Sequence, residues 1–124
     1  TVNIVGVSPV RSACLDESVK AGRILGEGEF RNEETISEGT AGGVDQDSFT
    51  LQIGKELVDS WIQVDEDAIR AAVREIEVMF GDKVEGAAGL ALAGWRSINQ
   101  PPRSGVGGSE NQCSILIVCG GNTG

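Results

Sequence analysis

The end of this 124-residue chain places a thiol, two glycines and an amide directly after an apolar run. The run covers residues 113–118, and Cys119, Gly120, Gly121 and Asn122 follow it. Short apolar runs bounded by turn residues are typical of buried strands, and ligands of parallel sheets bind where the strands end. Adjacent glycines also let a bulky group approach the backbone. The pattern therefore predicts either a ligand site at the end of a strand or, more simply, a core cysteine followed by a turn.

Two further features are candidates for chemistry. Glu85 directly precedes a run of small residues, 86–94. A carboxylate is favoured electrostatically at the start of a helix, which is also the simplest interpretation of Glu85. Residues 26–43 are rich in glycine and glutamate, include Gly39 and lack a regular pattern, and irregular stretches of this length are often functional. The glycines at 105–108 lead into a strand instead of a helix, so they lack the helix N-terminus that a phosphate loop requires.

The composition excludes several kinds of catalytic site. The chain contains no histidine, which excludes Ser-His-Asp and Cys-His nucleophiles and histidine-containing zinc sites. Its three cysteines, Cys14, Cys113 and Cys119, have no metal-binding spacing, and an odd number without a disulfide pattern fits a reducing compartment. We expect two of them to be core residues and the protein to be cytoplasmic. Any chemistry then depends on carboxylates, lysines, thiols or a cofactor.

Charge and hydropathy limit the partners. The formal net charge is −9, and such a field repels phosphate backbones, so we expect no nucleic-acid partner. No apolar run approaches the roughly 20 residues that a membrane-spanning helix needs, and the first residues lack the basic start of a signal peptide. Apolar residues make up 40% of the chain, enough for a core. We therefore expect a single domain over residues 1–124, without membrane attachment.

Strand-like and helix-like patterns alternate along the chain, and these elements must position the candidate residues. Strands that are nearly all apolar favour a parallel sheet that is covered on both faces. We therefore expect an α/β fold of three layers, with a mostly parallel sheet and helices on both faces. Asp65 is a good N-cap, and Ile69, Val73, Ile76 and Phe80 follow it at helical spacing, so this helix should pack on a core. The expected elements are strands at 2–7, 60–64 and 114–118, and helices at 11–21 (ending at Gly22), 47–59, 66–80 (ending at Gly81) and 84–94.

Six sequence segments occur in an order that resembles a known family. They are NIVGVSP, SVKAGRI, TISEGTAGG, ELVDSWIQVDEDAIRAAV, VEGAAGLALAG and ILIVCGGN. In this order and spacing the chain resembles the carboxyl-terminal part of the threonine/serine dehydratase group. These are pyridoxal-phosphate enzymes of the tryptophan-synthase-β-like fold, and they include serine and threonine ammonia-lyases, serine racemases and hydroxyaspartate ammonia-lyases. The resemblance spans nearly the whole chain and implies a partial domain of that fold.

The resemblance implies a role for each residue of the candidate site. In the family, a Ser or Cys at the position of Cys119 hydrogen-bonds the pyridine nitrogen. A neutral partner does not force a proton onto that nitrogen, so the cofactor becomes a milder electron sink, suited to β-elimination. Gly39 would lie against one ring face, and Glu85 would lie near the polar edge in an electrostatic, orienting role. The glycines after the thiol would let the backbone pass close to the ring, and the amide would hold the turn. The implied cofactor-binding residues are Gly39, Glu85, Cys119, Gly120, Gly121 and Asn122.

The sequence departs from the family at the groups that hold the cofactor. The family's Schiff-base lysine, in a Ser-x-Lys stretch, and its glycine-rich phosphate cradle do not occur in these 124 residues. Lys83, two residues before Glu85, is the nearest lysine, and we expect all the lysines of this chain to be surface residues. Some family members bind a divalent cation after the first strand. The matching positions here are Ser8, Ser12 and Cys14, which are poor ligands for a hard cation, so we predict no metal site.

Two hypotheses of different classes follow. In the first, the chain is a segment of a pyridoxal-phosphate-dependent serine/threonine (hydroxy amino acid) ammonia-lyase, and it supplies the pyridine-ring side of the cofactor pocket. It would bind no cofactor alone, contain no catalytic residue, be inactive alone, and need the amino-terminal half of the same enzyme to act on a small amino acid. In the second, it is a non-catalytic α/β binding or assembly module that forms a homodimer through its exposed apolar surface. Lyase and racemase activity stay open for the complete enzyme.

Overall fold

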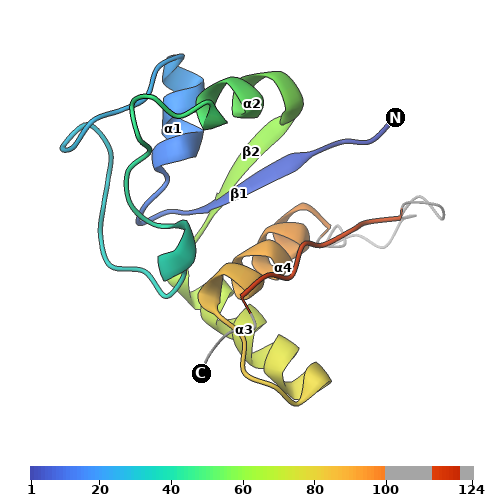
Figure 1. Cartoon of the computed structure of the whole chain (residues 1–124). Helices are drawn as coiled ribbons and strands as arrows, with labels where there is room; N and C mark the ends of the chain where they lie inside the picture. Colours follow the sequence, from blue (N-terminus) through green and yellow to red (C-terminus); the bar gives the residue numbers. More distant parts are fainter. Residues whose placement is uncertain (100–112, 121–124) are drawn as a thin grey trace, which may run out of the picture.

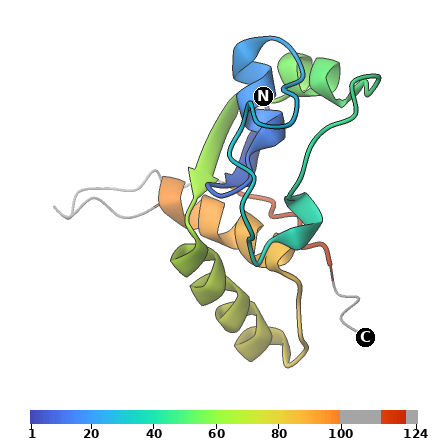
Figure 2. The same cartoon turned by 90° about the vertical axis from the view of Figure 1, so that its left-hand side faces the viewer.

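Two parallel strands form the centre of the structure, and helices cover both of their faces. The structure is a computed structural model that describes residues 1–99 and 113–120. The elements in chain order are β1 (Val5–Pro9), α1 (Cys14–Ala21), the short 3-10 helix η1 (Glu38–Thr40), α2 (Thr50–Leu57), β2 (Ser60–Val64), α3 (Glu66–Phe80) and α4 (Gly86–Ile98). Helices α1 and α2 lie on one side of the strands, and α4 and α3 lie on the other (Figures 1 and 2). The expected α/β fold, with a parallel sheet between helices, is confirmed.

The face of the sheet toward α1 and α2 is built around Trp61. Side chains alternate along a strand, so Trp61 and Gln63 of β2 point to the same face. The Trp61 ring covers Gly6 of the paired strand β1, where any side chain would collide with it. A Cβ on Gly54 of α2 would lie 3.3 Å from Trp61 Cζ2, and Gln63 Nε2 donates to Asp16 Oδ2 of α1 at 2.8 Å. Two glycines therefore make room for a large ring, and Gln63 fastens α1 to the sheet.

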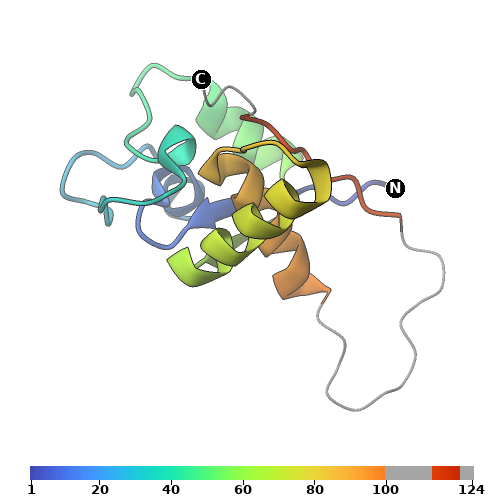
Figure 3. The same ribbon diagram turned by 90° about the horizontal axis from the view of Figure 1, so that it is seen from below.

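The opposite face of the sheet carries the apolar core. Val7 of β1 lies so close to Gly94 of α4 that a Cβ on this glycine would overlap it. Helix α3 packs against α4, and it is the nearer helix in the view from below (Figure 3). Gly89 of α4 lies against Val73 of α3 in the same way, so the small residues of α4 allow close approach on two sides. The buried side chains of this core are Val64, Ile69, Ala72, Leu90 and Ala93.

Helix α3 begins and ends at the predicted residues. Asp65 Oδ1 accepts a hydrogen bond from Ala68 N at 2.8 Å, and Gly81 ends the helix with a φ of 74°. The predicted packing face is correct for Ile69 and Ile76, which are buried, but wrong for Phe80, which is 66% exposed. Periodicity identifies the apolar face of a helix but not how far a neighbouring element extends along it. The last turn of α3 therefore exposes apolar side chains within the described part of the chain.

The expected third strand is absent from the described residues. Residues 113–120 have no regular secondary structure, and Ile115 and Ile117 are 86% and 71% exposed. A strand needs a neighbour that pairs its backbone groups, and β1 and β2 pair only with each other. The apolar run therefore lies outside the sheet. The prediction of two core cysteines is wrong for the same reason, because Cys113 and Cys119 are both exposed.

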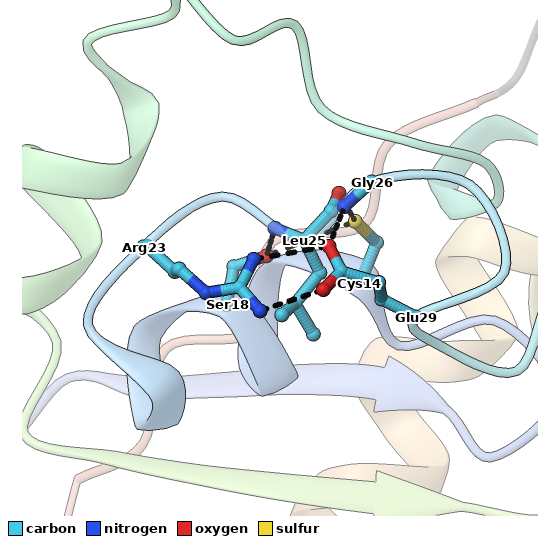
Figure 4. Close-up of polar contacts among 6 residues, drawn as sticks. All are labelled: Cys14, Ser18, Arg23, Leu25, Gly26 and Glu29. Carbon is cyan, nitrogen blue, oxygen red and sulfur yellow. Dashed lines mark hydrogen bonds and ion pairs between the residues drawn. The ribbon is translucent and has the colours of Figure 1, made fainter.

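Hydrogen bonds join the start of the long loop to α1 and loop residues to one another, as Figure 4 shows. Leu25 N donates to Ser18 Oγ at 3.0 Å. Arg23 donates two hydrogen bonds to the Glu29 carboxylate, at 3.0 and 2.6 Å, and Gly26 N donates a third at 2.7 Å. The Arg23 hydrogen bond, followed by the Gly26 bond, lowers the pKa of Glu29 from 4.5 to about 2. The irregular stretch is therefore locally ordered before it reaches the candidate site.

Candidate functional site

Buried hydroxyl groups build the turn that carries Gly39. Thr35 and Ser37 are 4% and 0% exposed. The carbonyl of Ser37 accepts from both N and Oγ1 of Thr40 at 3.0 Å, and the two side-chain hydroxyls lie 2.7 Å apart. These bonds close η1 and leave Gly39 exposed at its centre. The buried, hydrogen-bonded residues of this turn therefore hold Gly39, which has no side chain, at the surface.

Glu85 lies beside this turn, at the start of α4. It is the N-cap residue, but its side chain makes no capping hydrogen bond, and it is half-buried. A Cβ on Gly39 would lie 3.9 Å from Glu85 Oε2. The following residue, Gly86, presses on the backbone that leads into the turn, since a Cβ there would overlap the Ile36 carbonyl and lie 2.7 Å from Ser37 N. Because only glycine permits this approach, α4 can begin directly against η1.

Gly120 reaches Glu85 from a third segment of the chain, drawn in red in Figure 1. Glu85 N donates to Gly120 O at 2.8 Å. The φ of Gly120 is 83°, and a Cβ there would lie 2.6 Å from Glu85 Oε2. Cys119, the residue before it, is exposed. The last two predicted site residues, Gly121 and Asn122, lie outside the described residues.

The structure thus brings Gly39, Glu85 and Gly120 to one place, with Cys119 bonded directly to Gly120. This place has a carboxylate that is not used as a helix cap and an exposed glycine, Gly39, and the exposed residue Cys119 directly precedes Gly120 in the chain. Such groups can hold a flat, polar ring and orient its edges. Their assignment to a cofactor stays a prediction.

One residue of this neighbourhood, Glu66, was missed by the sequence analysis. Its Oε1 accepts from Thr35 Oγ1 at 2.5 Å, and its Oε2 accepts from Ile36 N at 2.9 Å. The partners lie 31 and 30 residues away in the sequence, so no local spacing links them. The only signal in the sequence was an acid in the first turn of a helix, and the helix dipole explains such an acid equally well.

Ser12, one of the positions that the sequence resemblance matches to a cation site, makes hydrogen bonds to other residues of this chain. Ser12 is 1% exposed. Its Oγ donates to Asn32 Oδ1 at 3.0 Å and accepts from Gly42 N at 2.9 Å. Within the part of the chain that the structure describes, no group of three His, Cys, Asp or Glu side chains could hold a metal ion.

A cavity of about 410 Å³ lies apart from the candidate site, between the end of β2, α3 and α4. Its polar lining comes from Gln63, Asp65, Arg96 and Ser97, and alanines and valines supply the rest. No predicted site residue lines it, so it does not extend the candidate site.

Among the described residues, no helix has the length and apolar character needed to cross a membrane.

Comparisons with known proteins place this geometry in context. No protein-family model matches the chain. The chain is 26% identical over 121 residues to the L-threonine dehydratase biosynthetic IlvA of Burkholderia multivorans (strain ATCC 17616 / 249), and the match covers 98% of this chain and 22% of that protein. The crystal structure of a threonine deaminase from T.th. matches with a TM-score of 0.64 and 27% identity, over 83% of this chain and 36% of that one. Maize serine racemase matches in fold, with a TM-score of 0.65 and 22% identity, over 80% of this chain and 31% of that one. The chain thus spans about a fifth to a third of the length of these proteins.

Proposed function

Since the chain resembles the threonine/serine dehydratase group in sequence and fold, as predicted, we propose that it is a segment of a pyridoxal-phosphate-dependent ammonia-lyase. The substrate class is a small hydroxy amino acid, and residues 1–124 form one domain of the enzyme. The observation that carries the proposal is the meeting of Gly39, Glu85 and Gly120, which come from three separate segments. These are residues to which the resemblance assigns the ring side of the cofactor pocket.

The residues present fit the pyridine-ring side of pyridoxal phosphate. Gly39 is exposed, and its missing side chain leaves a free surface beside the Glu85 carboxylate on which a flat ring can lie. This carboxylate makes no capping bond to α4, so it is available to the polar edge of the ring. Cys119 is exposed, and in this proposal its thiol is the partner of the ring nitrogen. When bound, pyridoxal phosphate supplies a sink for the electrons that remain when the α-proton of the substrate leaves.

In this proposal the chain binds and orients, and it moves no proton. Glu85 orients the ring edge electrostatically. Cys119 is a neutral partner, so it keeps the ring nitrogen from being forced into its protonated form, and this favours loss of the β-hydroxyl over transfer of the amino group. The lysine and the phosphate cradle come from polypeptide that precedes this segment in the family. The chain alone is therefore expected to bind no cofactor and to be inactive, and its working form pairs with that amino-terminal half in the cytoplasm.

Reconstitution tests the proposal. The chain is mixed with the amino-terminal portion of the Burkholderia multivorans dehydratase and pyridoxal phosphate, and release of ammonia and 2-oxo acid from L-threonine and L-serine is measured. We expect activity only when both polypeptides are present. Gly39→Leu should abolish the activity because its side chain occupies the place of the ring. Gly43→Leu should retain it, because Gly43 faces open space in the same loop.

Two results would contradict the proposal. The first is full activity of the mixture that contains Gly39→Leu. The second is a cofactor adduct on Lys83 of the isolated chain, detected by mass after borohydride reduction, since it would mean that this chain holds the cofactor by itself.

The non-catalytic alternative is favoured by one feature of α2. Phe49, Ile53 and Leu57 follow each other at intervals of four residues and are 74%, 43% and 58% exposed. Residues four apart lie on one face of a helix, so they form an apolar stripe, which we call the α2 stripe. An exposed stripe of this kind suits a homodimer or another protein partner. The two candidate functions differ in their requirement for pyridoxal phosphate, which reconstitution measures.

A further inference from the structure

We propose that Glu66 is the positioning residue of the candidate cofactor pocket. From the start of α3, its carboxylate holds residues 35–37 so that Gly39 faces Glu85. Glu66 acts through Thr35 and Ile36, so we assign it no contact with the cofactor. The inference rests on the proposed function for the identity of the ligand, but its geometric part stands on the described contacts alone.

The first argument is the pair of hydrogen bonds that Glu66 accepts. One carboxylate oxygen accepts from the Thr35 hydroxyl at 2.5 Å and the other from the Ile36 backbone N at 2.9 Å. The Thr35 hydroxyl also accepts from Ser37 N at 3.2 Å. Three consecutive residues are therefore fixed by one half-buried carboxylate. Hydrogen bonds to an ionised acceptor are stronger than those between neutral groups.

The second argument is the contact on the other side of the same segment. Gly86 of α4 presses on the Ile36 carbonyl and on Ser37 N. The segment is therefore clamped between the first residue of α3 and the first residue of α4. Two residues further along, Gly39 lies so that a Cβ on it would be 3.9 Å from Glu85 Oε2. Releasing the α3 side of the clamp frees Gly39 to move away from Glu85.

The chemistry of this position favours glutamate over other residues. A carboxylate offers an acceptor to each of the two donors, whereas an amide offers one acceptor and turns its NH₂ group toward the other donor. The positive end of the α3 dipole stabilises the negative charge of Glu66. Aspartate is one methylene shorter and cannot span the same gap without a shift of the backbone. The side chain is therefore suited to both its partners and its helix position.

Hydrogen exchange and NOE measurements on the isotopically labelled full chain test the inference. In Glu66→Ala, we expect exchange of the Ile36 and Ser37 amides to accelerate about tenfold relative to the amides of α3. The NOE between the Gly39 α-protons and the Glu85 γ-protons should disappear. Thr35→Val keeps the shape of its residue and removes the hydroxyl that links Glu66 to Ser37 N. It should therefore accelerate exchange of the Ser37 amide, while the Ile36 amide keeps its bond to Glu66, and this readout remains even if Glu66→Ala folds poorly.

Matched variants separate positioning from general stability. Asp67→Ala removes the next acid of the same helix turn and should leave the exchange of residues 36–40 unchanged. Glu66→Gln keeps one acceptor and should give intermediate exchange. In the reconstituted mixture, the half-saturating pyridoxal phosphate concentration should rise about tenfold for Glu66→Ala and change less than about twofold for Asp67→Ala.

Unchanged exchange and an unchanged NOE in both Glu66→Ala and Thr35→Val would overturn the inference. An equal rise in half-saturating cofactor concentration for Glu66→Ala and Asp67→Ala would also overturn it, because charge alone would then explain the effect. A wild-type mixture that binds no pyridoxal phosphate would contradict the proposed function. It would leave the exchange result as a test of the clamp.

Discussion

Glu29 makes the stability of one loop depend on pH. Arg23 and Gly26 N donate to its carboxylate and lower its pKa from 4.5 to about 2. Because the folded-state pKa lies below the unfolded one, the contribution to stability is complete above about pH 4.5 and is lost as the pH falls toward 2. We therefore expect the urea midpoint of the wild type to exceed that of Glu29→Gln at pH 7, and the difference to shrink between about pH 4.5 and 2.

The control for this prediction is Glu27→Gln, the same substitution two residues away, where Arg23 makes no hydrogen bond to the side chain. The difference in urea midpoint between Glu27→Gln and the wild type should not shrink below pH 4.5. A Glu29→Gln difference that stays constant from pH 7 to pH 2 would show that the loop does not depend on the ionised carboxylate.

A comparison of Gly120, in the candidate site, with Gly22, at the end of α1, distinguishes the cost of backbone strain from the effect of a side-chain contact. Both have positive φ, 83° and 77°, so alanine should cost about 1 kcal/mol at either position. Only at Gly120 does a new Cβ meet another group, 2.6 Å from Glu85 Oε2, while nothing lies within 4 Å at Gly22. We expect Gly120→Ala, but not Gly22→Ala, to accelerate exchange of the Glu85 amide, which donates to Gly120 O. Equal exchange of this amide in the two variants would mean that the contact is not maintained in solution.

At the scale of elements, sequence patterns predicted correctly those features that depend on residues close together in the chain. The ends of α3 follow from Asp65 and Gly81, because a cap bond and a positive φ involve residues only a few positions apart. Strand 60–64 also appears where it was predicted. By contrast, the apolar run 113–118 has no pairing partner among the described residues, so its strand pattern alone was insufficient. Glu66 was missed because its partners lie about thirty residues earlier.

In the candidate site, too, local features were predictable from the sequence pattern and contacts between distant segments were not. Glu85 was predicted as a helix-starting acid, and the structure places it at the N-cap of α4. Its proximity to Gly39 and Gly120 could not follow from periodicity, because it depends on glycines that let three segments approach closely. The family resemblance supplied that grouping, since it carries information about tertiary contacts that spacing within one element lacks.

The start of α3 offers a test at the scale of an element. Asp65→Ala removes the cap bond to Ala68 N, and loss of such a cap costs about 1 kcal/mol. Asp67→Ala removes a charge from the same turn but no cap bond, so it should cost less, toward the lower end of the range of about 0.3–1 kcal/mol for a charge near a helix end. Urea unfolding followed by circular dichroism measures both free energies. Equal costs would show that the helix dipole, and not the cap, defines the start of α3.

At the scale of the whole molecule, a strong negative charge and exposed apolar side chains act in opposite directions. The net charge of −9 makes two copies repel each other. The α2 stripe and the last turn of α3, with Val78, Met79 and Phe80 at 63–85% exposure, favour association. Repulsion between surface charges is screened by salt, whereas burial of apolar surface is not. Ionic strength therefore decides which tendency dominates.

We accordingly expect the isolated chain to self-associate more strongly at about 0.5 M than at about 0.02 M salt, as measured by sedimentation equilibrium. Ile53→Lys should weaken the association about tenfold, because it removes from the centre of the α2 stripe an exposed aliphatic side chain that association of two copies would bury. Gln52→Lys makes the same change of charge on the neighbouring position and reduces the repulsion, so it should associate at least as well as the wild type. If the two variants weaken association equally, or if the chain stays monomeric at every salt concentration, then the α2 stripe does not join two copies. The assembly-module hypothesis would then lose the observation that favours it over the enzyme segment.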